Sequence, residues 1–187
     1  MAHRSRTGSV RRDRDPAGRP RNARPRDALG RPLPRGGRDD AEARIPDDLS
    51  IAGPDAARLA DRLLRAGRPF HAHEVLEASW KSGPPDERDL WQGLAQVAVG
   101  LTHARRGNAR GAMALLRRGA ERARGYQIRY GPTRAGDRPY GMDLETFLAA
   151  AEDLAARIER HGLDGIPAAA LRPGLLRAPR PPAPPEP

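Results

Sequence analysis

Residues 70–80 read Phe-His-Ala-His-Glu-Val-Leu-Glu-Ala-Ser-Trp, and this stretch predicts a helix with polar side chains on the face that should be buried. A helix advances about 100° per residue, which places five of these residues on one stripe: Phe70, His73, Leu76, Glu77 and Trp80. Buried polar groups cost free energy unless they are paired. We therefore expect the stripe to be either a hydrogen-bonded structural network or the lining of a site.

Helical periodicity extends from this stretch in both directions, interrupted by residues that end or begin helices. Glycine closes a helix readily, and proline is tolerated at its start. We predict five helices, over residues 55–66, 69–82, 86–106, 109–124 and 144–161, with Gly67, Gly107 and Gly162 as stops and Asn108 and Asp143 as N-caps. Nothing alternates with period two, and the first three links are short. The predicted fold is all-α, a compact bundle of about five helices.

The fourth predicted helix carries small residues on one side. The spacing of Gly111, Leu115 and Gly119 leaves a shallow groove. Glycine in a helix costs about 1 kcal/mol relative to alanine, so a close helix crossing is expected to compensate. After this helix we predict a long connection over residues 125–142, held to the bundle by four side chains: Tyr126, Ile128, Tyr130 and Tyr140.

The two ends of the chain differ in composition from the middle. Residues 1–44 contain 13 Arg and 6 acidic residues, a net charge of +7, whereas residues 45–171 carry only +1. The C-terminal end is rich in proline. Neither end has enough large apolar side chains to offset the entropy lost on ordering. We predict a disordered arm over residues 1–49, a helical domain over 50–162 and a Pro-rich disordered tail over 163–187.

Composition also narrows the classes of protein. There is no cysteine, which excludes disulfides, a thiolate nucleophile and a Cys-ligated metal. No apolar run approaches the roughly 18 residues of a membrane span, and the Arg-rich start lacks the apolar region of a secretory signal. We expect a cytoplasmic protein without a membrane partner. The charge of residues 1–44 predicts only weak, salt-dependent nucleic-acid binding through this arm.

One hypothesis for the polar stripe is a metal site. His73 and Glu77 are one helical turn apart, and His103 could face them from the next helix. Two imidazoles and a carboxylate with an open position are typical of catalytic zinc. Glu74 would then be the candidate general base, and the protein a divalent-metal-binding protein or a metal-dependent hydrolase.

The other hypothesis is a buried network that fixes how two helices meet. One imidazole nitrogen of His73 would bond Glu77, the other would contact His103 or Gln96, and Trp80 would cover the group from water. His71 is expected to face solvent, and Trp91 to lie in the core. On this hypothesis the protein is a non-enzymatic binding or structural module, which we favour over an enzyme. A third possibility is a module that binds a protein partner or a second copy of itself.

The same residues resemble a known family, the domain of unknown function 309. The resemblance rests on residues 70–80, on residues 92–98, which read Gln-Gly-Leu-Ala-Gln-Val-Ala, and on residues 103–112, which contain His-Ala-Arg-Arg-Gly-Asn. It spans residues 58 to about 148, and Ala78 and Ser79 depart from its usual pattern. It implies a small all-helical bundle and no assigned reaction. The candidate structural cluster is Phe70, His73, Glu74, Glu77, Trp80, Gln96, His103, Gly107, Asn108 and Gly111.

Overall fold

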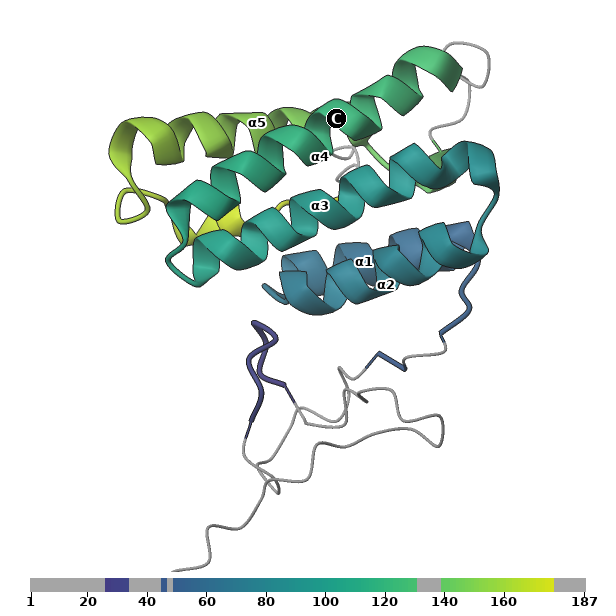
Figure 1. The fold of residues 1–187 in the computed structure, drawn as a ribbon, viewed down its shortest axis with the longest axis horizontal. Coiled ribbons are helices and arrows are strands. Elements are labelled where there is room, and N and C mark those ends of the chain that lie inside the picture. The colour runs from purple at the N-terminus through teal and green to yellow at the C-terminus, as the bar shows by residue number, and fades with distance from the viewer. Residues whose placement is uncertain (1–25, 34–44, 47–48, 131–138, 177–187) are drawn as a thin grey trace, which may run out of the picture.

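Five α-helices form the body of the protein in this computed structural model, which describes residues 26–33, 45–46, 49–130 and 139–176 (Figure 1). The helices are α1 (Gly53–Arg65), α2 (Pro69–Ser82), α3 (Arg88–Arg105), α4 (Ala109–Tyr130) and α5 (Leu144–His161). Short 3-10 turns lie at η2 (Pro85–Glu87), η4 (Pro139–Gly141) and η5 (Ala168–Leu171). The described residues contain isolated β-bridges but no strand, so the all-α prediction is confirmed.

Helices that follow one another in sequence pack side by side. Figure 1 shows α3 in the middle, with α1 and α2 on one side and α4 and α5 on the other. In α3 the helical spacing of the apolar residues places four of them on one face, and each is at most 1% exposed: Leu90, Leu94, Val97 and Leu101. The stripe of α5 is buried in the same way and covers α4. The periodicity therefore identified the core faces of these two helices correctly.

Glycines end three helices as predicted. Gly67, Gly107 and Gly162 have φ values of 71°, 81° and 70°, the left-handed conformation that residues with a Cβ rarely adopt. Asn108 caps α4, since its Oδ1 accepts a hydrogen bond of 2.9 Å from the backbone N–H of Gly111. Asp143 is the N-cap residue of α5, as predicted, but its side chain makes no capping hydrogen bond to the first turn. Its backbone N–H instead donates to the carbonyl oxygen of Leu175 at 2.9 Å.

The fourth helix is longer than the sequence indicated. It continues through residues 125–130, which we had assigned to a connection. Gly125 does not end the helix. Tyr126, the next residue, is buried on the same side of the helix as Ala123, whereas Gly125 itself is exposed. Ile128 does not pin the chain to the bundle, as its side chain is 77% exposed. Residues 131–138 and the Tyr130 side chain lie outside the described part of the chain.

The folded unit extends beyond the predicted boundary at residue 162. Residues 163–176 return along the bundle, and Leu175 is fully buried. The carboxylate of Asp61 in α1 accepts hydrogen bonds from the backbone N–H groups of Leu175 and Leu176 at 2.7 and 2.9 Å. The buried carboxylate of Asp61 thus holds the backbone of this segment in place. Composition alone could not predict this contact. The predicted disorder of 177–187 lies outside the described residues.

Part of the N-terminal arm also has a defined structure. Residues 26–33 form a tight turn against the bundle, so the predicted disorder of 1–49 does not hold for this segment. Most of the arm to which we assigned weak nucleic-acid binding is outside the described residues. In the part of the chain that the structure describes, no helix is both long and apolar enough to cross a membrane.

Candidate functional site

The buried face of α2 differs in phase from the predicted stripe. Small and branched residues fill it, and α2 packs against both α1 and α3, which makes the buried face wide. His71, expected to face solvent, is only 5% exposed. The larger side chains of the predicted stripe lie at the edges of this face, half-buried: Phe70, His73, Glu77 and Trp80. The inward face consists of Pro69, His71, Ala72, Val75, Leu76 and Ser79.

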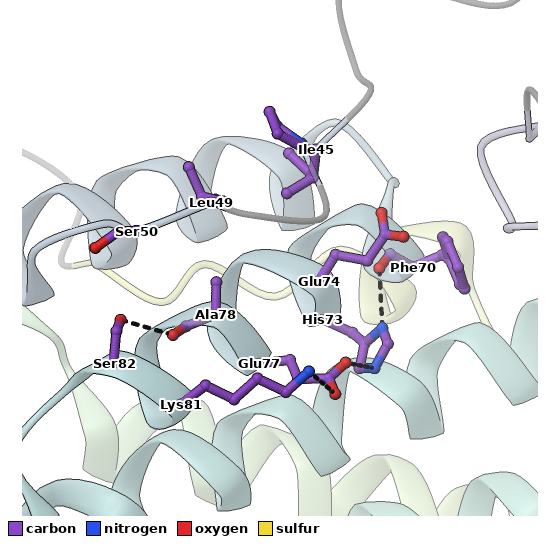
Figure 2. Close-up of a pocket in the computed structure, with 11 residues that line it drawn as sticks. Ile45, Leu49, Ser50, Phe70, His73, Glu74, Glu77, Ala78, Lys81 and Ser82 are labelled. Carbon is purple, nitrogen blue, oxygen red and sulfur yellow. Dashed lines mark hydrogen bonds and ion pairs between the residues drawn. The ribbon is translucent and has the colours of Figure 1, made fainter. Parts of the chain in front are cut away.

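Three polar side chains form a ladder along the outer edge of α2. His73 Nε2 lies 3.3 Å from Glu77 Oε2, and Lys81 Nζ lies 2.8 Å from Glu77 Oε1 (Figure 2). The exposed fractions of their side chains rise along the helix from 24% to 35% to 59%. The predicted contact between His73 and Glu77 is therefore present. The group is not enclosed, however, because its outer end reaches solvent.

The environment of His73 shifts its proton affinity. Its Nδ1 lies 3.3 Å from the carbonyl oxygen of Phe70. We had predicted that this nitrogen would contact His103 or Gln96 instead. Burial lowers the pKa of His73 below its ordinary value of 6.5, and this effect exceeds the opposing influence of the Glu77 carboxylate and the Phe70 carbonyl. The imidazole is therefore mainly neutral at neutral pH.

A pocket of about 510 Å³ opens beside this ladder. It lies between α2 and the segment that precedes α1, which carries Ile45 and Leu49 (Figure 2). Glu74, the candidate general base, contributes to its wall, and Phe70 forms one end. Apolar groups on one side thus face charged groups on the other. The lining residues are Ile45, Pro46, Leu49, Ser50, Phe70, His73, Glu74, Glu77, Ala78, Lys81 and Ser82.

His103 belongs to a different local structure, the turn between α3 and α4. Its Nδ1 lies 2.7 Å from Nδ2 of Asn108, whose Oδ1 accepts the N–H of Gly111. Since the amide nitrogen of Asn108 can only donate, the Nδ1 of His103 accepts and its proton lies on Nε2. Gly111 leaves room for the imidazole, because a Cβ there would lie 2.5 Å from His103 Nδ1. These signature residues, together with Gly107, cap two helix ends.

The candidate metal ligands do not converge. Among the described residues there is no group of three or more His, Asp or Glu side chains placed to hold a metal ion. His73 and Glu77 lie together, whereas His103 is engaged with Asn108. Gln96 is half-buried, and its Oε1 has no hydrogen-bond partner in the described structure. The residues present therefore do not fit the zinc arrangement expected from their spacing.

Trp80 and Trp91 have different roles. Trp80 is half-buried, and the charged ends of Arg88 and Lys81 lie 5.2 and 5.9 Å from its ring centroid. Trp91 is 1% exposed, which confirms its predicted place in the core. Its Nε1 donates to the buried carboxylate of Glu87 at 3.0 Å, and Tyr140 donates to the same carboxylate. This second polar group was not predicted, because Tyr140 reaches Glu87 from a segment 53 residues away in the sequence.

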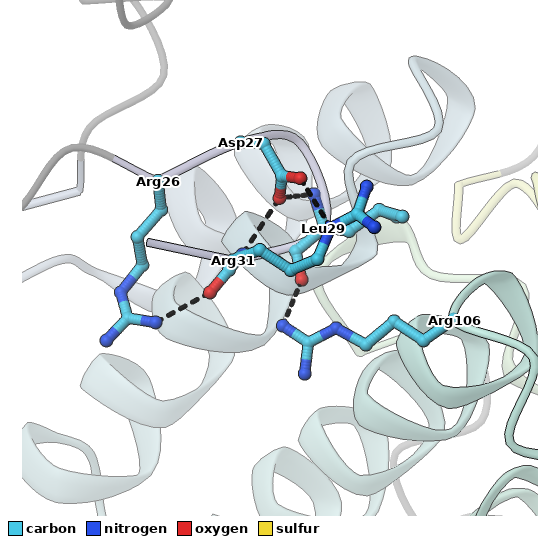
Figure 3. Close-up of polar contacts among 6 residues, drawn as sticks. Arg26, Asp27, Leu29, Arg31 and Arg106 are labelled. Carbon is cyan, nitrogen blue, oxygen red and sulfur yellow. Dashed lines mark hydrogen bonds and ion pairs between the residues drawn. The ribbon is translucent and has the colours of Figure 1, made fainter. Parts of the chain in front are cut away.

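Another contact missed at the sequence level joins the N-terminal arm to Phe70. The guanidinium of Arg26 lies 5.4 Å from the Phe70 ring centroid, and a Cβ on Gly30 would overlap that ring. Arg106, the residue directly after α3, donates a hydrogen bond to the carbonyl oxygen of Leu29 (Figure 3). The turn of residues 26–33 therefore packs against one side of Phe70.

Comparison with known proteins finds that part of the chain is similar to a family of unassigned function. The Uncharacterized protein YpuF of Bacillus subtilis (strain 168) is 48% identical over 48 residues, which are 25% of this chain and 28% of YpuF. The match thus spans little more than a quarter of that relative's length. No solved structure matches the chain. Residues 58–115, which include all of α2 and α3, match the model of the family described as Domain of unknown function (DUF309), as the sequence predicted.

Proposed function

We propose that this protein is a non-enzymatic binding module whose ligand occupies the pocket on α2. The pocket itself is the observation that carries the proposal. Its volume of about 510 Å³ is in the range of small-molecule sites, and its walls combine apolar surface with a few fixed polar groups. The α2 wall lies within the segment that matches the family model, residues 58–115.

Charge narrows the class of ligand. The pocket is lined by two carboxylates, Glu74 and Glu77, and by one ammonium group, Lys81. His73 adds little positive charge at neutral pH, because burial lowers its pKa. The lining side chains therefore carry one more negative than positive charge. Two guanidinium groups that do not line the pocket, those of Arg26 and Arg106, lie 5.4 and 6.0 Å from the Phe70 ring centroid. A small amine that bears an aromatic or aliphatic group would match the charge of the lining and its apolar surface.

A pair of probes with the same ring separates the two contributions. Phenethylamine carries an ammonium group and phenylacetate a carboxylate, so titration of each into the full chain, followed by amide NMR, compares charge at constant apolar area. We expect phenethylamine to shift the resonances of Phe70 and Ala78 in a saturable way, and phenylacetate to bind more weakly. Equal binding of both, or no saturable shift with either, would refute the proposal.

A matched pair of variants tests the assignment of Glu77. Glu77→Gln removes a charge from the pocket, whereas Glu121→Gln removes one from an exposed position on α4. The first change should weaken phenethylamine binding, and the second should leave it unchanged. If the two variants behave alike, the attraction comes from the overall charge of the protein and not from the pocket.

A further inference from the structure

Two arginine side chains from distant parts of the chain converge on the turn between α1 and α2. A Cβ placed on Gly67 would lie 2.7 Å from Nη1 of Arg105 and 3.1 Å from Nε of Arg172. Gly67 is itself buried and has a left-handed φ of 71°. The two guanidinium groups therefore lie close together over a backbone turn that carries no side chain.

Both guanidinium groups are unpaired within the described part of the chain. Among the described residues, the side chains of Arg105 and Arg172 make no hydrogen bond and no ion pair. A third arginine, Arg65, is neutralised by Asp61 at 2.9 Å. Basic side chains are favoured at the C-terminal ends of helices such as α1 and α3. Arg105 and Arg172, however, donate no hydrogen bond to the described carbonyl groups at those helix ends. Their positive charges also repel each other, because the two groups lie close together.

The backbone positions of the two arginines are set by the fold. Arg105 is the last residue of α3, and the left-handed Gly107 closes the turn that follows it. Arg172 directly follows η5, three residues before Leu175, whose backbone is held by Asp61. The tertiary structure thus brings the two cations together before any ligand binds, which reduces the entropy that a ligand must overcome.

We infer that Arg105 and Arg172 form a binding site for a phosphate group. A carboxylate is satisfied by the two parallel N–H groups of one guanidinium, whereas a phosphate dianion has enough charge and oxygen atoms to bridge two. The absence of a Cβ on Gly67 lets the guanidinium groups approach the backbone at this point. The site is separate from the α2 pocket and does not depend on the function proposed for it.

The inference is tested by amide and guanidinium NMR of the full chain during titration with inorganic phosphate at constant ionic strength. Residues 1–44 carry 13 Arg and attract anions nonspecifically, so the readout is local: the Gly67 amide and the Nε–H groups of Arg105 and Arg172. We expect saturable shifts there, and weaker binding of acetate under the same conditions. Acetate that binds as tightly as phosphate would overturn the assignment to phosphate.

Variants separate this site from general electrostatic attraction. Arg105→Gln combined with Arg172→Gln should abolish the saturable shift of Gly67, and each single change should weaken binding by about tenfold, the typical effect of losing a charge-assisted hydrogen bond. Arg118→Gln, an exposed position on α4, should have no effect. Thermal unfolding of the double variant checks that it is folded. Unchanged phosphate shifts in a folded double variant would overturn the proposal.

Discussion

Gly93 of α3 and Gly119 of α4 pack backbone against backbone. A Cβ on Gly119 would lie 2.6 Å from the carbonyl oxygen of Gly93, and a Cβ on Gly93 would lie 2.7 Å from the carbonyl oxygen of Gly119. Real Cβ atoms do not approach backbone atoms so closely, so any other residue would force the two helices apart. The close crossing expected from the small residues of α4 is therefore confirmed at Gly119, with Gly93 as its partner.

Gly119→Ala should lower the free energy of unfolding by roughly 1–3 kcal/mol, because overpacking at a rigid contact outweighs the better helix propensity of alanine. Urea denaturation followed by circular dichroism measures the change. Gly125→Ala is the matched control, since nothing lies within 4 Å of its Cβ position in the same helix. It should stabilise the protein by about 0.5–1 kcal/mol. A stabilising effect at both positions would contradict the close packing.

Asp61 holds the C-terminal segment against α1. Asp61→Ala leaves two backbone N–H groups without their acceptor and Arg65 without its ion-pair partner. We expect a loss of roughly 1–3 kcal/mol in the free energy of unfolding. Hydrogen exchange of residues 163–176 should increase more than that of α3.

A surface ion pair provides the comparison for this change. Asp55 bonds Arg58 at 2.5 Å, and both side chains are more than half exposed. Asp55→Ala should therefore change stability by less than about 1 kcal/mol. Protection of residues 163–176 that is unaltered in Asp61→Ala would show that this carboxylate does not hold the segment.

The lowered pKa of His73 predicts a dependence of stability on pH. The unfolded state, with a pKa near 6.5, takes up a proton before the folded state does. Stability from this group is therefore present above pH 6.5 and is lost as the pH falls from 6.5 toward the folded-state pKa. In urea denaturation, wild type should lose more stability than His73→Gln between about pH 7.5 and about pH 5.5. Equal losses would indicate that folding does not shift this pKa.

The ends of most helices could be predicted because their signals are local. Pro69 opens α2, and Gly83 follows its last residue, so the bounds of that helix were predicted correctly. The end of α4 was missed because Gly125 resembles a stop, and only the burial of Tyr126 shows that the helix continues past it. The docking of Leu175 depends on Asp61, more than a hundred residues earlier, and leaves no local pattern.

The candidate site was predicted less well, since the neighbours of α2 decide which side chains are buried. Periodicity grouped His73 with Glu77 correctly, as the two are one turn apart on the same helix. It could not show that α1 and α3 both contact α2 and bury His71 instead. His103 was assigned to the wrong partners because its contact with Asn108 depends on the geometry of the turn after Gly107.

The central claim, that the α2 pocket binds a ligand, is tested most directly by locating phenethylamine on the protein. Intermolecular nuclear Overhauser effects give the protons that lie next to the probe. The account predicts contacts from the ring to Phe70 and Leu49, and from the methylene beside the ammonium group to Glu77. Contacts confined to another surface, or none at saturating probe, would contradict it.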